Sequence, residues 1–317
     1  MSVLCLLALL ALPAPVVRPE VPRADRREPP TGDSAPPCRL LSLSGGGSWG
    51  AFEAGVLQRL IVERGEGFDY ERILGVSAGS LNAALLATEA PGHAGLLAGS
   101  ATLRKLWTDA RTRDVWRFKP LSLDERADKS LLSNAPLGEL LGRALAGRTI
   151  RRNLTVGLTS LATGRPVVVD EAEIARAGGA QLVPLLLASS AIPVLFPPVH
   201  YNRTLFVDGG IGSNVLTVHG VERCPNVPVQ LDIINCLPLI GQLALRSMQV
   251  LLETAFDHQL SFKCAPGERS NVLARIYSPR QGLGIVVPTV LDFDFGARLW
   301  QAGYEQSAAP DEFYFCV

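Results

Sequence analysis

A serine lies between two glycines in the run Gly75-Val76-Ser77-Ala78-Gly79, which has the spacing of a nucleophile elbow. In such an elbow a strand turns sharply into a helix, and the serine hydroxyl stands where it can attack a carbonyl carbon. The turn brings main-chain atoms together, so the residues two before and two after the serine must be very small. Ser77 is therefore the candidate nucleophile, and the N–H of Ala78 is a candidate donor to the resulting oxyanion.

A glycine-rich loop precedes the elbow, between a strand-like run at 39–44 and an apolar helical pattern at 51–60. Glycines let backbone N–H groups point at one small volume near the positive end of the helix, which favours negative charge there. The loop is therefore a candidate oxyanion hole for acyl transfer. Its glycines are Gly45, Gly46, Gly47 and Gly50.

The same loop also fits the G-x-G-x-x-G fingerprint of dinucleotide-binding proteins. That fingerprint predicts a second strand that ends in an acidic residue about 20 residues later. The second strand does follow, but it ends at Gly75, Val76 and Ser77, with no acid at its end. The sequence therefore favours the oxyanion interpretation over a nucleotide cofactor.

An aspartate ends a short β-like run further along the chain, in the stretch TLFVDGG at 204–210. A carboxylate at the position of Asp208 can accept the proton of a nucleophile, and the turn at Gly209 and Gly210 lets the chain leave the strand sharply. The structural alternative for Asp208 is a turn-forming residue in a surface loop.

Strand and helix signals alternate from residue 39 onward, which predicts an α/β fold with a mostly parallel sheet covered by helices on both faces. Residues 111–135 are irregular and charged, and we expect a solvated connection there in preference to a flap over the site. The expected strands are 39–44, 70–76, 153–161, 166–170, 204–208, 228–235 and 272–277. The expected helices are 51–60, 79–89, 182–191, 239–260 and 292–307.

Taken in this order, the strand, the glycine loop, the elbow and the Asp-Gly-Gly turn resemble the patatin-like phospholipases. Segment 158–165 resembles the strand and turn that precede the acid in that family, and 188–199 resembles its A-S-x-A-I-P-x-x-F-P-P-V segment. The resemblance covers about residues 39–216 and is weaker beyond them.

The resemblance implies a three-layer architecture and a two-residue dyad, with Ser77 as nucleophile and Asp208 as general base. It makes Gly45, Gly46 and Gly47 the oxyanion loop. It also implies a lipid substrate met at a membrane or micelle surface, namely fatty-acyl esters of phospholipids or glycerolipids, and no metal or cofactor.

Two positions depart from the pattern of the family. Many members carry Arg or Lys where this chain has Trp49, which removes a positive charge from the loop. The Asn-x-Pro that often follows the Asp-Gly-Gly turn lacks its proline, since Asn214 is followed by Val215 and Leu216. A catalytically inactive lipid-binding or scaffold member is the alternative function, which the intact dyad and loop glycines disfavour.

A histidine-containing triad is the alternative to the dyad. His219 and His258 both follow Asp208, so the chain order of a lipase triad is formally possible, but no sequence context marks either histidine. In a dyad the carboxylate takes the serine proton directly, which requires that apolar surroundings raise its pKa. The apolar residues Leu81, Ala84 and Leu85 after the elbow could line an acyl tunnel or belong to an ordinary helix core.

Composition excludes several other functions. The formal net charge is +0 and the pI is about 6.9, whereas a nucleic-acid-binding protein would show a basic face. No C-x-x-C pair, Cys/His cluster or D-x-D-x-D-G loop is present, so neither a zinc nor a calcium site is expected. Residues 38–317 are expected to form one acyl hydrolase domain, with 217–317 its less certain part.

Residues 1–37 are not expected to belong to the fold. The apolar run at 3–12 is too short to span a bilayer but suits the core of a signal peptide, and a Pro-rich linker follows it. We therefore expect entry to the secretory pathway, with a cytosolic or membrane-peripheral protein as the alternative, because no Lys or Arg precedes the run. The six cysteines are expected to be buried free thiols with at most two disulfides. Of the two glycosylation sequons, the one at Asn153 begins an expected core strand, and the other is at Asn202.

Overall fold

A mixed β-sheet runs through the molecule, and the computed structural model describes residues 36–119, 130–224, 227–236, 271–279, 291–306 and 310–315. Within these residues the sheet has nine strands, which are β1 (Cys38–Leu43), β2 (Arg72–Val76), β5 (Asn153–Ser160), β6 (Pro166–Val169), β7 (Val199–Tyr201), β8 (Thr204–Asp208), β9 (Val229–Ile234), β10 (Val272–Tyr277) and β11 (Asp311–Phe315). Their order is β11-β10-β9-β1-β2-β5-β8-β7, with β6 paired to β5. Neighbouring strands from β10 to β5 are parallel, whereas β11, β6, β8 and β7 join antiparallel.

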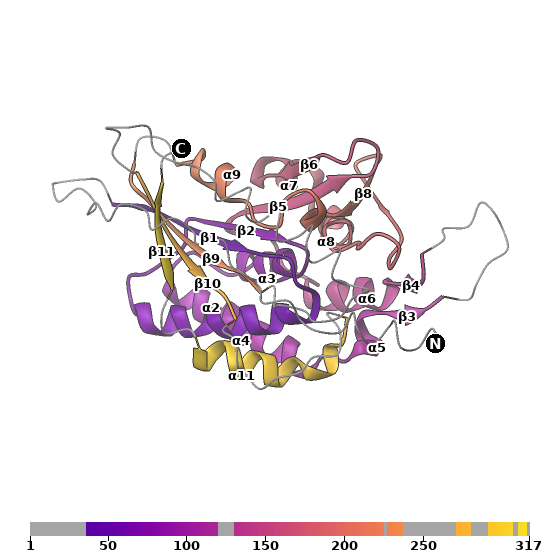
Figure 1. The fold of residues 1–317 in the computed structure, drawn as a ribbon, viewed down its shortest axis with the longest axis horizontal. Helices are drawn as coiled ribbons and strands as arrows, with labels where there is room; N and C mark the ends of the chain where they lie inside the picture. Colours follow the sequence, from indigo (N-terminus) through magenta and orange to yellow (C-terminus); the bar gives the residue numbers. More distant parts are fainter. Residues whose placement is uncertain are drawn as a thin grey trace, which may run out of the picture.

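Helices cover both faces of this sheet. The helices α2 (Gly50–Arg64), α4 (His93–Asp109) and α11 (Gly296–Gln306) lie together on one side, and α9 (Thr217–Val221) lies on the other (Figure 1). A separate two-stranded hairpin is made by β3 (Arg117–Phe118) and β4 (Leu132–Ser133). The remaining helices are α3 (Ala78–Ala87), α5 (Thr112–Val115), α6 (Ala135–Ala144), α7 (Glu171–Ala177) and α8 (Leu182–Ser189).

The central strands are apolar on both faces because helices bury both faces. In β1, Leu41 and Leu43 pack into the core beneath α2, while Leu40 packs into the second core beneath α9. The pair α2 and α11 approaches unusually closely: a Cβ built on Gly55 would lie 2.1 Å from the carbonyl oxygen of Trp300. Glycine is therefore needed at this helix crossing.

The observed architecture confirms the predicted fold class, and each expected strand has a counterpart. The helix expected at 292–307 divides into a 3₁₀ turn at Phe293–Phe295 and α11, with the Asp292 carboxylate accepting from the N–H of Asp294. The prediction for 111–135 was wrong in part, because its described residues form α5 and the hairpin, and Val115 is buried. The helix expected at 239–260 lies outside the described residues.

A disulfide joins Cys38, the first residue of β1, to Cys224, just after α9. Cys236 is a free, buried thiol. Cys5, Cys264 and Cys316, and with them the expected leader, lie outside the described residues. Among the described helices, none combines the length and apolar composition that a bilayer span requires.

Candidate active site

Ser77 lies at the carboxyl end of β2, on the sharp turn into α3. Its backbone is in the positive-φ region, with φ 51° and ψ −124°, as a strained elbow requires. A Cβ on Gly75 would lie 2.4 Å from the carbonyl oxygen of Gly79, and one on Gly79 would lie 2.3 Å from that of Leu43. The two flanking glycines are thus required by the close approach of backbone.

The Ser77 hydroxyl donates a hydrogen bond of 2.7 Å to Oδ2 of Asp208. The two residues are 131 positions apart in the chain, and both side chains are buried, with exposed fractions of 5% and 4%. Burial raises the pKa of Asp208 to about 6, while hydrogen bonds from Ser77 and from the Gly210 N–H act in the opposite direction. The carboxylate is therefore poised to accept a proton near neutral pH.

The turn after Asp208 fixes the orientation of its carboxylate. The N–H of Gly210 donates to Oδ1 at 2.8 Å, which leaves Oδ2 for the serine. A Cβ on Gly209 would lie 2.3 Å from the carbonyl oxygen of Gly157 in β5, so glycine is needed where the chain leaves the strand.

The glycine loop lies beside the nucleophile. A Cβ on Gly45 would come within 3.1 Å of Ser77 Cβ, and Gly47 and Ala78 line the same pocket as Ser77. The N–H of Gly45 is already used, because it donates to Asn214 Oδ1 at 3.0 Å.

Within the described part of the chain, the N–H groups of Gly46, Gly47 and Ala78 have no hydrogen-bond acceptor. Gly50 leaves room for the side chain of Trp107, since a Cβ on Gly50 would lie 2.6 Å from the Trp107 ring. The loop thus offers unpaired donors next to the serine, which can receive an oxyanion.

Two residues that sequence reasoning missed hold these parts together. Ser189 accepts from the N–H of Ser77 at 2.9 Å and donates to the carbonyl oxygen of Gly157 at 2.7 Å. The Asn214 amide also donates to the carbonyl oxygen of Gly45 at 3.5 Å, so it binds both polar groups of that glycine. Both residues lie in segments that resemble the family, but nothing in their local sequence states what they bind.

The described histidines do not contact the dyad. His93 binds the carbonyl oxygen of Ile61, and His200 and His219 are exposed. The carboxylate of Asp208 bonds only to Ser77 and Gly210 among the described residues. His258 lies outside them.

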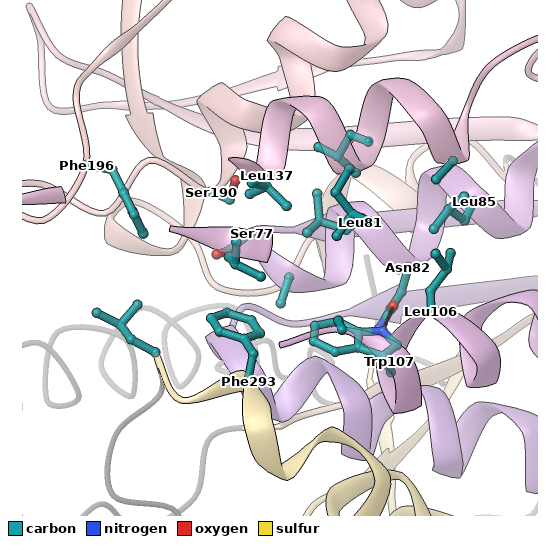
Figure 2. A pocket seen from close by; sticks show the side chains of 18 of the residues that line it. Ser77, Leu81, Asn82, Leu85, Leu106, Trp107, Leu137, Ser190, Phe196 and Phe293 are labelled. Carbon is teal, nitrogen blue, oxygen red and sulfur yellow. Dashed lines mark hydrogen bonds between the residues drawn. The ribbon is translucent and has the colours of Figure 1, made fainter. Parts of the chain in front are cut away.

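An apolar pocket extends from Ser77 along α3 (Figure 2). The space free of protein atoms in this pocket is about 770 Å³, a volume that includes open solvent. In the view of Figure 2, Phe196 and Leu85 lie on opposite sides of Ser77. The lining includes Leu81 and Leu85 of α3, Leu106 and Trp107 of α4, Leu137 and Leu141 of α6, and Ile192, Phe196, Leu291 and Phe293 from loops and turns.

One polar chain crosses the wall of this pocket. The Asn82 amide donates to Glu53 Oε2 at 2.7 Å and to the carbonyl oxygen of Gly50 at 3.0 Å, and it accepts from Trp107 Nε1 at 2.7 Å. Glu53 is fully buried and its Oε1 has no partner among the described residues. Burial raises the pKa of Glu53 well above its usual value, while the hydrogen bond from Asn82 acts in the opposite direction. No group of three or more His, Cys, Asp or Glu side chains within the described residues is arranged to hold a metal ion.

Comparison with known proteins shows that a family model and two named proteins match this chain. The model of the family described as patatin-like phospholipase matches residues 41–219, more than half of the chain. A cGAMP-activated phospholipase of Escherichia coli (strain TW11681) is 28% identical over 202 residues, which cover 56% of this chain and 53% of that protein. A cGAMP-activated phospholipase of Pseudomonas aeruginosa (strain BWHPSA011 / Pa011) is 29% identical over 200 residues, which cover 59% and 57%. The chain therefore spans about half the length of the curated relatives it matches.

Among solved structures, the crystal structure of VipD from Legionella pneumophila matches at a TM-score of 0.41 and 17% identity, covering 88% of this chain and 68% of that one. The type III effector protein ExoU matches at a TM-score of 0.34 and 14% identity, covering 89% and 56%.

Proposed function

Since the chain belongs to the patatin-like phospholipase family, we propose that it hydrolyses fatty-acyl esters of phospholipids or glycerolipids through a Ser77 acyl-enzyme. The observation that carries the proposal is the 2.7 Å hydrogen bond from Ser77 Oγ to Asp208 Oδ2 at an apolar pocket. The bond joins a nucleophile to a base, and the pocket offers an acyl chain a place away from water.

In the first half of the reaction, Asp208 Oδ2 takes the proton of Ser77 as Oγ attacks the ester carbonyl carbon. The carbonyl oxygen becomes an oxyanion, which the N–H groups of Gly46, Gly47 and Ala78 stabilise. The C–O bond to the alcohol then breaks, and the departing alkoxide takes the proton from Asp208. The acyl group remains on Ser77 as an ester.

In the second half, water attacks the acyl-enzyme while Asp208 accepts one of its protons. The new oxyanion forms against the same N–H groups. Its collapse breaks the bond to Ser77 Oγ, which recovers its proton from Asp208, and the fatty acid leaves. Asp208 thus acts alternately as base and acid, a role that suits a pKa of about 6.

Labelling with a fluorophosphonate tests the proposal directly, because the reagent reacts only with an activated serine. We expect the wild-type protein to be labelled and to hydrolyse a soluble short-chain ester. Ser77→Ala should be unlabelled and lose at least about a hundredfold in kcat while it remains folded.

His219→Ala is the matched control and should retain activity, since His219 is exposed and is not among the described hydrogen-bond partners of Asp208. A wild-type protein that binds lipid but neither reacts with the probe nor hydrolyses esters would instead be an inactive lipid-binding member. A collapse of activity in His219→Ala or His258→Ala with the fold intact would replace the dyad by a triad.

A further inference from the structure

The carboxyl-terminal end of helix α8 contacts the backbone of both dyad residues. Ser189 is the last residue of α8, which packs against β5 and β8. Its hydroxyl accepts a hydrogen bond of 2.9 Å from the N–H of Ser77. The carbonyl oxygen of Ala191, a little further along, accepts one of 2.9 Å from the N–H of Asp208. Residues 189–191 therefore bind the N–H groups of two residues that lie 131 positions apart in the chain.

The elbow at Ser77 is held at both of its backbone polar groups. Its carbonyl oxygen is held locally by Ser80, whose hydroxyl donates at 2.6 Å and whose N–H donates at 2.9 Å. Its N–H is held by Ser189, which comes from a distant part of the chain. A serine with a φ of 51° keeps this unfavourable backbone only where the surrounding structure fixes it. Ser189 thus supplies the long-range half of that constraint.

The second hydrogen bond of Ser189 leads toward the base. Its hydroxyl donates to the carbonyl oxygen of Gly157 in β5 at 2.7 Å. That oxygen lies against Gly209, where a Cβ would be only 2.3 Å from it, and the next residue of β5, Leu158, pairs with Asp208. The Ser189 hydroxyl therefore connects the end of β2 with the place where β5 contacts the turn after the base.

Ser189 has no free group with which to act on a substrate. Its exposed fraction is 0%, and it is not among the described residues that line the pocket, although its neighbour Ser190 is. A serine hydroxyl carries one proton, and that of Ser189 is used on Gly157. Any effect of Ser189 on the reaction must therefore pass through the position of Ser77.

We propose that Ser189 is a positioning residue for the reaction, whose hydroxyl holds Ser77 at the distance and direction from Asp208 that proton transfer requires. This inference rests on the proposed function, because it concerns the same pair of residues. Proton transfer needs the serine hydroxyl within hydrogen-bond reach of the carboxylate, and the observed 2.7 Å satisfies this. A misplacement of about 1 Å can cost about a hundredfold in rate.

Ser189→Ala tests this role in the full chain, because it removes the hydroxyl and little else. We expect kcat for a soluble short-chain ester to fall about ten- to a hundredfold, while KM changes less than about threefold because the pocket lining is intact. The value of kcat is expressed per serine labelled at completion by a fluorophosphonate, so unfolded protein does not lower it. Ser189→Thr keeps a hydroxyl and should recover most of the lost activity.

The pH dependence separates positioning from a loss of stability. Burial raises the pKa of Asp208 to about 6, against the opposing effect of the hydrogen bond from Ser77. When Ser77 is displaced in Ser189→Ala, that hydrogen bond weakens, so the midpoint of kcat/KM against pH should move upward from its wild-type value. A loss of stability alone would leave the midpoint where it is.

Ser100→Ala is the matched control. Ser100 is as buried as Ser189, and its hydroxyl donates to the carbonyl oxygen of Leu97 within its own helix, α4. This variant should keep the wild-type kcat and the wild-type midpoint. A Ser189→Ala protein with the wild-type kcat per labelled serine would overturn the proposal, and so would a lowered kcat with an unmoved midpoint.

Crystal structures of the wild-type protein and of Ser189→Ala give an answer that does not depend on turnover. We expect the distance from Ser77 Oγ to Asp208 Oδ2 to lengthen in the variant beyond about 3.2 Å, the limit of hydrogen-bond reach. An unchanged distance would overturn the proposal. A lengthened distance in the variant of a protein that shows no esterase activity would refute only the proposed function.

Discussion

At the scale of single residues, the ionisation of Asp208 decides when the site is ready to react. Its pKa is raised to about 6 because burial penalises the carboxylate more than the bonds from Ser77 and Gly210 favour it. A general base works only when deprotonated, so low pH leaves the serine without an acceptor for its proton.

We therefore expect kcat/KM for a soluble short-chain ester to rise with pH, with a midpoint at about pH 6, and to level off above it. The measurement is a pH–rate profile of the wild-type protein on an uncharged ester, with His219→Ala as control. A midpoint near 3.8, the ordinary value for aspartate, would contradict the effect of burial. If the rise of kcat/KM with pH were absent in His219→Ala, the rise would be due to His219 and not to Asp208.

Glu53 is a second buried carboxyl group, and its effect is on stability. Its raised pKa means that the folded protein keeps a proton which the unfolded chain releases above about pH 4.5. The unfolded state then binds fewer protons than the folded state, so the free energy of unfolding falls as the pH rises, until Glu53 itself ionises in the fold.

We expect Glu53→Gln to remove this dependence, because an amide does not ionise. Above pH 6, where Asp208 no longer contributes a similar slope, the wild-type free energy of unfolding should fall with rising pH relative to that of the variant, until Glu53 ionises in the fold. Urea unfolding of both proteins across mildly acidic to alkaline buffers measures the difference. Parallel curves for the two proteins would mean that Glu53 is already charged in the fold.

At the scale of elements, helix α3 serves both as the support of Ser77 and as the floor of the pocket. Ala78, Leu81, Asn82 and Leu85 recur at helical spacing along one face, and all line the pocket. Leu85 lies eight positions after Ser77, which corresponds to about 12 Å of helix. An extended acyl chain advances about 1.3 Å per carbon, so Leu85 lies level with about the tenth carbon.

Leu85→Trp should therefore shorten the accepted chain. We expect the ratio of kcat/KM for a palmitoyl ester to that for a butyryl ester to fall about tenfold or more, with the butyryl value nearly unchanged. Leu81→Trp, one turn nearer the serine, should reduce both values. An equal loss on both esters in Leu85→Trp, accompanied by a lower melting temperature, would show that Leu85 is ordinary core, since overpacking destabilises.

The elements that can be predicted from the sequence are those whose function depends only on residues close together in the chain. The elbow, the glycine loop and the Asp-Gly-Gly turn each need small residues at fixed spacing, and such patterns are visible in one dimension. Helices α4 and α6 supply Trp107 and Leu137 to the pocket but were not predicted, because their role depends on packing against α3.

The supporting hydrogen bonds were unpredictable for a related reason. Ser189 reaches Ser77 across 112 residues, and Asn214 reaches Gly45 across 169. No spacing rule connects residues so far apart, so only the folded sheet brings them together. The strand β11 was missed as well, since a short segment at the edge of a sheet carries little pattern of its own.

At the scale of the whole molecule, one covalent bond joins distant parts. The Cys38–Cys224 disulfide closes a loop between positions 186 residues apart, which restrains the unfolded chain and is worth about 2–4 kcal/mol. Such bonds persist in oxidising compartments. Together with the apolar run at 3–12, this leads us to propose that the protein enters the secretory pathway.

Expression in a mammalian cell line tests this proposal. We expect a lumenal or secreted product that lacks residues 3–12, contains the disulfide, and carries a glycan at Asn202 but not at Asn153. Both asparagines are exposed, but Asn202 lies in the turn between β7 and β8, whereas Asn153 begins β5 and its amide donates to the carbonyl oxygen of Glu71. Peptide mass spectrometry reads all three features, with Asn202→Gln as control. A cytosolic product with an intact Met1 and no glycan would rule the proposal out.

The position of β9 beside β1 limits which fragments of the protein can fold by themselves. The family match ends at residue 219, yet β9 pairs with β1 along its whole length, and the N–H of Cys236 after β9 donates to Ser44 Oγ at 2.9 Å beneath the glycine loop. A chain that stopped at 219 would expose β1 as a bare apolar edge, which is a template for aggregation. The segment that contains the catalytic motifs is therefore not expected to fold by itself. Any fragment meant to fold must continue through β9 and the strands after it.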